Sequence, residues 1–107
     1  MSAILVAHTK VKNLDKLMEY AKAVPKTLEP FGVEFIYRGK VADVLIGEHA
    51  PEMAAIIRFP DYAVLKEWFY SPAYNALVPI REEGAEMTFV AFDDDASGVT
   101  NLPPVKR

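Results

Sequence analysis

The stretch AILVAHTKVKNLDKLMEYAKAVPKTL, residues 3–28, decides the fold because its hydrophobic pattern changes part-way along. Residues 3–11 form an almost continuous apolar run rich in β-formers, which predicts a strand with both faces at least partly covered. After Asn13, which can cap a helix, apolar residues recur every three or four positions and charged residues fill the other side. We therefore expect a strand and then an amphipathic helix, which Pro25 distorts near its end.

Two further strands are expected in the middle of the chain. The stretch VEFIYRGK, residues 33–40, has the alternation of a strand and is interrupted by a glycine near its end. Residues 41–47 are also β-like and are expected to extend this strand beyond a bulge. The turn-like EHAPE, residues 48–52, leads into an apolar strand at residues 53–59. We expect this strand and the extended one before it to form a hairpin.

A second helix and a final strand complete the order. Asp61 is a good helix cap, and the pair Ser71 and Pro72 is typical of a new helix start. We expect the helix to be re-initiated there, with Pro79 distorting its middle. The stretch EMTFVAF, residues 86–92, is rich in β-formers and predicts the last strand.

These elements follow the order β-α-β-β-α-β, the split βαβ pattern of ferredoxin-like α+β folds. In this fold a four-stranded antiparallel sheet carries both helices on one face and leaves the other face open. An open face with apolar side chains is too large a patch for a solvated monomer, so we expect a second copy of the chain to cover it. We assign residues 1–92 to this domain and expect residues 93–107 to form a C-terminal extension packed on the domain or on the partner subunit.

Composition limits the classes of protein and of partner. The chain has 107 residues, of which 51% are hydrophobic and 25% are charged, as is usual for one globular domain. A formal charge of −3 with no basic cluster argues against nucleic acid as a partner. No stretch approaches the roughly 20 apolar residues of a membrane span, and the lack of cysteine removes disulfide and thiolate chemistry. We expect a cytoplasmic protein that does not bind membranes.

Three residues are candidates for catalysis. His8 lies in the first predicted strand, where an imidazole can titrate near neutral pH. Tyr74 and Arg81 share one face of the second helix, and they supply a phenol that can donate a proton and a cation that can hold a carboxylate or enolate. We expect these two residues to converge with His8. The structural alternatives are a hydrogen-bonded core histidine, a tyrosine with its hydroxyl at the rim, and an arginine paired with an acidic residue.

Three further residues are candidates for ligand binding. Ser71 shares the same helix face, Arg38 offers a cation at a strand end, and Trp68 offers an aromatic surface. The alternatives are a helix cap, a solvated ion pair and a core aromatic residue. Glu48 and His49 are adjacent on an extended chain and so point to opposite sides. We therefore expect no metal site, and no motif in the sequence indicates a cofactor.

Several short motifs carry a resemblance to a known family. The most specific is WFYSPAYNALVPIR, from Trp68 to Arg81. The others are the Tyr20-Ala21 pair, the stretch from Phe31 to Gly39, the Gly47-Glu48 pair and the Phe59-Pro60 pair. On these residues the chain resembles the domain of unknown function 1330 family, within the dimeric α/β-barrel superfamily. The resemblance implies the ferredoxin-like fold and dimerisation, and it implies no particular reaction.

Two hypotheses about function remain open at this point. In the first, the protein is a cofactor-free enzyme in which His8 acts as a base or orienting group while Arg81 and Tyr74 stabilise an oxyanion. By analogy with barrel relatives, the reaction is proton transfer or oxygenation of a small acidic or aromatic molecule. In the second hypothesis, the protein binds such a ligand without turnover, or it is a purely structural homodimer.

Overall fold

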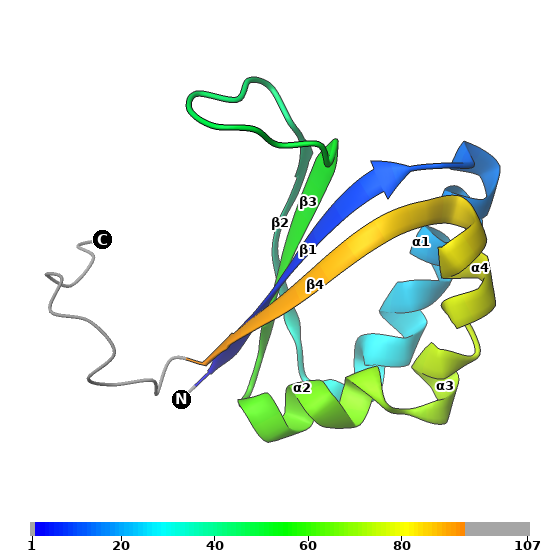
Figure 1. Cartoon of the computed structure of the whole chain (residues 1–107). Helices are drawn as coiled ribbons and strands as arrows, with labels where there is room; N and C mark the ends of the chain where they lie inside the picture. Colours follow the sequence, from blue (N-terminus) through cyan, green and yellow to red (C-terminus); the bar gives the residue numbers. More distant parts are fainter. Residues whose placement is uncertain (1, 94–107) are drawn as a thin grey trace, which may run out of the picture.

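The computed structural model describes residues 2–93, and Figure 1 shows how the elements are arranged. In chain order they are β1 (Ala3–Val11), α1 (Leu14–Leu28), the 3-10 turn η1 (Glu29–Phe31), β2 (Glu34–Lys40), β3 (Met53–Phe59), α2 (Tyr62–Phe69), α3 (Pro72–Asn75), α4 (Val78–Gly84) and β4 (Ala85–Asp93). The predicted β-α-β-β-α-β order is confirmed, with the second helix divided into α2, α3 and α4.

The four strands form one antiparallel sheet in the order β2-β3-β1-β4. Figure 1 shows all the helices on one side of this sheet, while the other side carries none within residues 2–93. The ferredoxin-like α+β architecture is therefore confirmed, with one covered and one open sheet face. No helix in the described part of the chain is long and apolar enough to cross a membrane.

β1 shows how the sequence divides the sheet into two faces. Leu5 and Ala7 are buried under the helices, whereas the even-numbered residues beside them are only partly buried. His8 belongs to the second set, and its cross-strand neighbours are Ala54 on β3 and Thr88 on β4. Because successive side chains of a strand point to opposite faces, His8 lies on the open face.

The hydrophobic core lies between the sheet and the helices. Its largest fully buried side chains are those of Trp68, Tyr74, Phe59 and Leu28. The ring of Trp68 packs on Tyr74 with centroids 4.3 Å apart and on Phe59 with centroids 5.6 Å apart. Its indole N–H donates to the Thr27 hydroxyl at 2.9 Å, so the buried donor is satisfied. This cluster holds α2 and α3 against the sheet.

α1 begins and ends close to the predicted positions. The side chain of Asn13 caps the helix by accepting a hydrogen bond from the backbone N–H of Lys16 at 3.2 Å. The helix then continues through Pro25 to Leu28 and only afterwards tightens into η1. The irregularity expected near Pro25 is limited to this final tightening.

Local signals divide the second helix into three short pieces. Asp61 caps α2 by accepting a backbone hydrogen bond from its first turn at 2.8 Å. The Ser71 hydroxyl caps α3 by accepting from the backbone N–H of Tyr74 at 3.2 Å, and it donates to the carbonyl of Trp68 at 2.7 Å. The predicted re-initiation at Ser71 is therefore confirmed. Pro79, however, lies in the first turn of α4, where proline is well tolerated, and does not distort the middle of a helix.

The expected extension of the second strand over residues 41–47 is wrong. These residues belong to a loop, residues 41–52, that projects from the sheet (Figure 1). The backbone N–H of Val41 still donates to the carbonyl of Glu52 at 2.8 Å, but β3 begins only at Met53, so no strand of the described chain lies beside residues 41–47 to continue the ladder. β2 and β3 still pair with each other as the expected hairpin.

A close approach between α1 and α4 fixes the helices that carry the site. The carbonyl oxygen of Gly84 accepts hydrogen bonds from the backbone N–H groups of Lys12 at 2.9 Å and Asn13 at 3.0 Å. A Cβ atom on Gly84 would lie 2.7 Å from the backbone nitrogen of Leu17, so this position requires glycine. α4 therefore packs directly against the start of α1.

The predicted domain and its extension meet at the end of β4. Asp93 closes that strand, and residues 94–107 lie outside the described residues. Packing of the extension on the domain or on a partner subunit therefore stays a prediction.

Candidate functional site

The covered side of the sheet holds a cavity of about 190 Å³, bordered by α1 and by all four strands. Most of its wall is apolar and includes Leu5, Leu17, Met18, Val24, Ile57 and Phe89. The wall also includes Trp68 and three residues with polar groups, Thr9, Tyr20 and Arg38. An apolar cavity with a few polar groups is the usual form of a small-molecule site.

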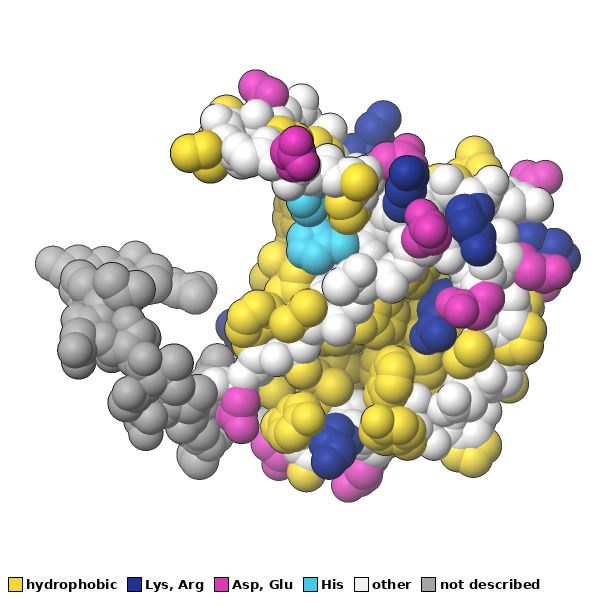
Figure 2. Space-filling view, viewed as in Figure 1, with side chains coloured by type: hydrophobic (Ala, Val, Ile, Leu, Met, Phe, Trp, Pro, Cys, Tyr) yellow, Lys and Arg dark blue, Asp and Glu magenta, His cyan; other side chains and the backbone are white. Residues whose placement is uncertain are grey.

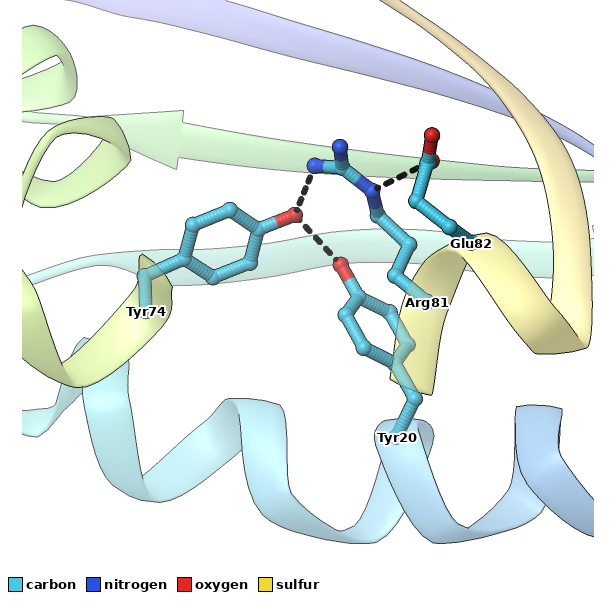
Figure 3. Close-up of polar contacts among 4 residues, drawn as sticks. All are labelled: Tyr20, Tyr74, Arg81 and Glu82. Carbon is cyan, nitrogen blue, oxygen red and sulfur yellow. Dashed lines mark hydrogen bonds and ion pairs between the residues drawn. The ribbon is translucent and has the colours of Figure 1, made fainter. Parts of the chain in front are cut away.

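Tyr20 connects this cavity to a buried chain of hydrogen bonds. Its hydroxyl oxygen lies 2.7 Å from the hydroxyl oxygen of Tyr74. The Tyr74 oxygen also accepts a hydrogen bond from Nη1 of Arg81 at 2.9 Å. Figure 3 shows the three side chains converging from α1, α3 and α4. The polar ends of three side chains, each from a different helix, thus meet at one point beside the cavity.

The direction of the protons in this chain follows from its chemistry. Arg81 can only donate, so the Tyr74 oxygen must accept from it. Tyr74 is 0% exposed, and within residues 2–93 its hydroxyl has hydrogen bonds with Arg81 and Tyr20 alone. The hydroxyl proton of Tyr74 has an acceptor only if Tyr74 donates to Tyr20. In that arrangement the Tyr20 proton is not used within the pair, and Tyr20 is one of the residues that line the cavity.

Burial keeps the Tyr20 phenol protonated. Desolvation raises the pKa of Tyr20 well above its ordinary value of 10.0, the neighbouring Tyr74 phenol raises it further, and Arg81 has a smaller opposite effect. At neutral pH, Tyr20 is therefore a hydrogen-bond donor and not a base.

Arg81 supplies a fixed positive charge behind the two phenols. Partial burial opposes its ionisation, but the hydrogen bond to Tyr74 and the electrostatic interactions with Tyr74, Tyr20 and, least of all, Glu82 outweigh this and raise the pKa of Arg81 above its usual range. Its guanidinium carbon lies 5.9 Å from the ring centroid of Tyr74 and 5.8 Å from that of Phe89. The Glu82 carboxylate, 3.4 Å from Nε of Arg81, is largely exposed and contributes little energy.

The structure brings Tyr74 and Arg81 together, as expected, but not with His8. The expected convergence of all three is wrong for a single chain, because the alternation of β1 turns His8 to the open face. There the ring centroid of His8 lies 5.2 Å from that of His49, and Nδ1 of His8 is buried without a hydrogen-bond partner among residues 2–93. A catalytic role for His8 stays a prediction and applies only to the open face.

The three predicted ligand-binding residues lie in different surroundings. Arg38 and Trp68 both line the cavity. Ser71 is not among the lining residues, and its hydroxyl is engaged in capping α3. Ligand contact therefore stays a prediction for Arg38 and Trp68, and we no longer assign it to Ser71. Within residues 2–93, no three histidine or acidic side chains are grouped in a way that could hold a metal ion.

Tyr20 is the site residue that the sequence analysis missed. It follows Leu17 by three positions on the buried face of α1, a spacing that is equally typical of a core residue. The signal that pointed to it was its place in the Tyr20-Ala21 motif. A phenol on an otherwise apolar helix face needs a polar partner, and this requirement was the physical clue.

The raised pKa of Tyr20 predicts how stability changes at alkaline pH. Above pH 10 the unfolded chain releases the Tyr20 proton while the folded chain keeps it, so the free energy of unfolding falls as pH rises. Urea unfolding of Tyr20→Phe should therefore show a fall between pH 10 and pH 11 that is about 1 kcal/mol smaller than in wild type. Tyr70→Phe removes an exposed phenol and serves as the control. Equal falls in all three proteins would contradict the buried, protonated phenol.

Solved structures with this fold are distant in sequence. A protein of unknown function from Rhodopseudomonas palustris has a TM-score of 0.76 at 16% identity, covering 99% of this chain and 84% of that chain. A dimeric ferredoxin-like protein of unknown function from Jannaschia sp. CCS1 has a TM-score of 0.71 at 13% identity, covering 87% of this chain and 99% of that chain. SnoaB, a cofactor-independent oxygenase from Streptomyces nogalater, has a TM-score of 0.65 at 7% identity, covering 92% of this chain and 98% of that chain. Identities this low show that the fold is shared and nothing more.

The family is established by the sequence itself. No curated protein sequence matches the chain significantly. A family model, however, matches residues 2–94, which include every element of the sheet and the helices around it. The motif resemblance predicted the same assignment. The chain therefore belongs to the family described as Domain of unknown function (DUF1330).

Proposed function

We propose that the cavity on the covered side of the sheet binds a small acidic or aromatic molecule as its oxyanion. We further propose that the protein is a cofactor-free enzyme that uses this site for proton transfer or oxygenation. The observation that carries the proposal is the hydrogen-bond chain from Arg81 through Tyr74 to Tyr20, which ends at the wall of an apolar cavity.

The size and lining of the cavity set the size of the ligand. An apolar cavity of about 150 Å³ is large enough to bind benzene. A cavity of about 190 Å³ therefore suits one ring with small substituents. The apolar walls would hold the ring, and the Tyr20 hydroxyl would hold an oxygen atom attached to it.

The arrangement favours the charged form of such a ligand. A hydrogen bond from Tyr20 stabilises an oxyanion, and the Arg81 charge strengthens it because Tyr74 polarises the Tyr20 hydroxyl. The described lining contains no carboxylate or imidazole that could act as a base. The role we assign to the site is therefore to lower the energy of a phenolate, enolate or carboxylate, so that the ligand loses its proton to solvent water and the anion can react with dissolved oxygen.

The chemistry of one structural neighbour supports this proposal. SnoaB is a cofactor-independent oxygenase, and it shares the fold of this chain. An enzyme without a cofactor can activate an organic anion through its own hydrogen-bond donors, and the oxyanion site described here supplies such donors. The alternative function is binding of the same ligand without turnover.

We also propose that two copies of the chain pair through their open sheet faces. Figure 2 shows hydrophobic side chains gathered beside the two histidines, beneath the projecting loop. On this face Val90 is 40% exposed and Phe92 is 53% exposed, and in the loop Leu45 and Ile46 are almost fully exposed. Such a surface is typical of an interface. The relative from Jannaschia sp. CCS1 is dimeric, which supports the same arrangement here.

Thermal unfolding with phenol and with benzoate tests the ligand site. At about ten times the dissociation constant, either ligand should raise the unfolding midpoint of the wild type by about 5 °C or more. Tyr20→Phe and Arg81→Met should each weaken the binding of benzoate about tenfold, because this anion loses one charge-assisted hydrogen bond or the charge behind it. The rise should then shrink to about a third at the same ligand concentration.

The matched control is Tyr70→Phe, which removes the hydroxyl of an exposed tyrosine and should respond like the wild type. The proposal fails if neither phenol nor benzoate stabilises the wild type. It also fails if Tyr20→Phe and Arg81→Met respond as strongly as the wild type does.

A further inference from the structure

Arg38 reaches the cavity because β2 is irregular. Phe35 and Arg38 are three residues apart, so in a regular strand they would face opposite sides. The register shifts between Phe35 and Tyr37, and Arg38 then pairs with Ala55, whose other neighbour is the covered-face residue Ala7. Phe35 and Arg38 therefore both line the cavity. The bulge directs a guanidinium toward the covered side of the sheet.

This guanidinium has a charge without a protein partner. Within residues 2–93 the side chain of Arg38 makes no hydrogen bond and no ion pair, whereas that of Arg58 on the next strand is bound to Glu34 at 3.0 Å. Arg38 is also the one charged residue in the described lining of the cavity. A planar guanidinium binds a carboxylate through two parallel hydrogen bonds. The Arg38 guanidinium is therefore available to bind the carboxylate of a ligand.

The two polar ends of the cavity come from different elements. Tyr20 lies on α1 and is 6% exposed, so its hydroxyl belongs to the interior end. Arg38 lies on the edge strand β2 and is exposed, so its guanidinium belongs to the solvent end. Apolar side chains form the wall between them. One ring that carries an oxygen group on each of two opposite sides matches this pattern.

We infer that the ligand is a single-ring carboxylate with a second oxygen, a hydroxyl or carbonyl group, on the far side of the ring. The carboxylate binds Arg38, and the second oxygen accepts the hydrogen bond from Tyr20. This inference rests on the proposed function, because it names the class of molecule that the same oxyanion site takes. The ring itself is held by the apolar wall between the two polar ends.

Calorimetric titration with 4-hydroxybenzoate and with phenol tests the inference. The wild type should bind 4-hydroxybenzoate about 10- to 100-fold more tightly than phenol, because a charge-assisted bidentate contact is added. Arg38→Gln should remove this difference while phenol binding stays the same. Lys22→Gln, which removes an exposed positive charge from α1, should leave both affinities unchanged.

The outcomes separate this inference from the proposed function. If phenol binds and Tyr20→Phe weakens it, but 4-hydroxybenzoate binds no more tightly, the inference is wrong and the oxyanion site stands. If Arg38→Gln and Lys22→Gln reduce the affinity for 4-hydroxybenzoate equally, the carboxylate responds to the overall charge of the protein and not to Arg38, and the inference is again wrong. If neither molecule binds, the proposed function fails, and the inference fails with it.

Discussion

Tyr74→Ala should lower the free energy of unfolding by about 3–5 kcal/mol, the range found when a buried aromatic side chain is cut back to alanine. The ring is fully buried and packs against Trp68 at 4.3 Å and Phe69 at 5.8 Å between centroids. Its hydroxyl also joins Tyr20 to Arg81. Urea unfolding at neutral pH measures the loss, and the thermal midpoint should fall by more than about 12 °C.

Tyr74→Phe is the matched control because it keeps the ring and removes the oxygen alone. It should cost about 1–3 kcal/mol, since the buried hydroxyl of Tyr20 and the guanidinium of Arg81 lose a partner. Two results would contradict this account of the core. One is a loss of less than 1 kcal/mol for Tyr74→Ala, and the other is an equal loss for both variants.

Val90→Glu should convert the proposed dimer into a folded monomer. Val90 lies on the open face of the edge strand β4, opposite Val6, and it is 40% exposed in the single chain. The single chain therefore tolerates a carboxylate there, whereas an interface between two sheets would bury it without a partner. We expect the dissociation constant of the dimer to rise at least about 100-fold, equivalent to about 3 kcal/mol.

Light scattering after gel filtration measures this change. Tyr62→Glu is the control, because Tyr62 is 43% exposed but lies on α2, on the covered side of the sheet. This variant should remain as dimeric as the wild type. A wild-type protein that is monomeric at all concentrations, or a Val90→Glu protein that still dimerises normally, would show that the open face is not the interface.

Much of the fold could be predicted because its signals are local. The apolar run of β1, the Asn13 cap and the Ser71-Pro72 pair each act through a few neighbouring residues. Pro79 was misread because proline either distorts a helix or begins one, and the choice depends on the residues that end the preceding turn. The loop after β2 was misread because β-propensity does not show whether a neighbouring strand exists to pair with.

The site was harder to predict than the fold because it depends on which face each residue occupies. Tyr74 and Arg81 were found from their helical spacing, and they do meet. His8 was placed with them only because the apolar run of β1 leaves its two faces indistinguishable in sequence. Arg38 reaches the cavity through a bulge in β2, and Tyr20 faces it from a helix position typical of a core residue. Both placements depend on the tertiary structure, and the sequence signals for these residues, the Tyr20-Ala21 motif and a cation at a strand end, do not show which way the side chains point.

Under the proposed function, the cavity stabilises an oxyanion through Tyr20, Tyr74 and Arg81. The most direct test is the absorbance of bound 4-nitrophenol as a function of pH, because its phenol and phenolate forms differ in colour. We predict that binding to the wild type lowers the pKa of 4-nitrophenol by about 1 and that Tyr20→Phe removes most of this effect. An apolar cavity without an oxyanion site would instead raise that pKa by desolvation. A raised or unchanged pKa for the bound phenol would contradict the account.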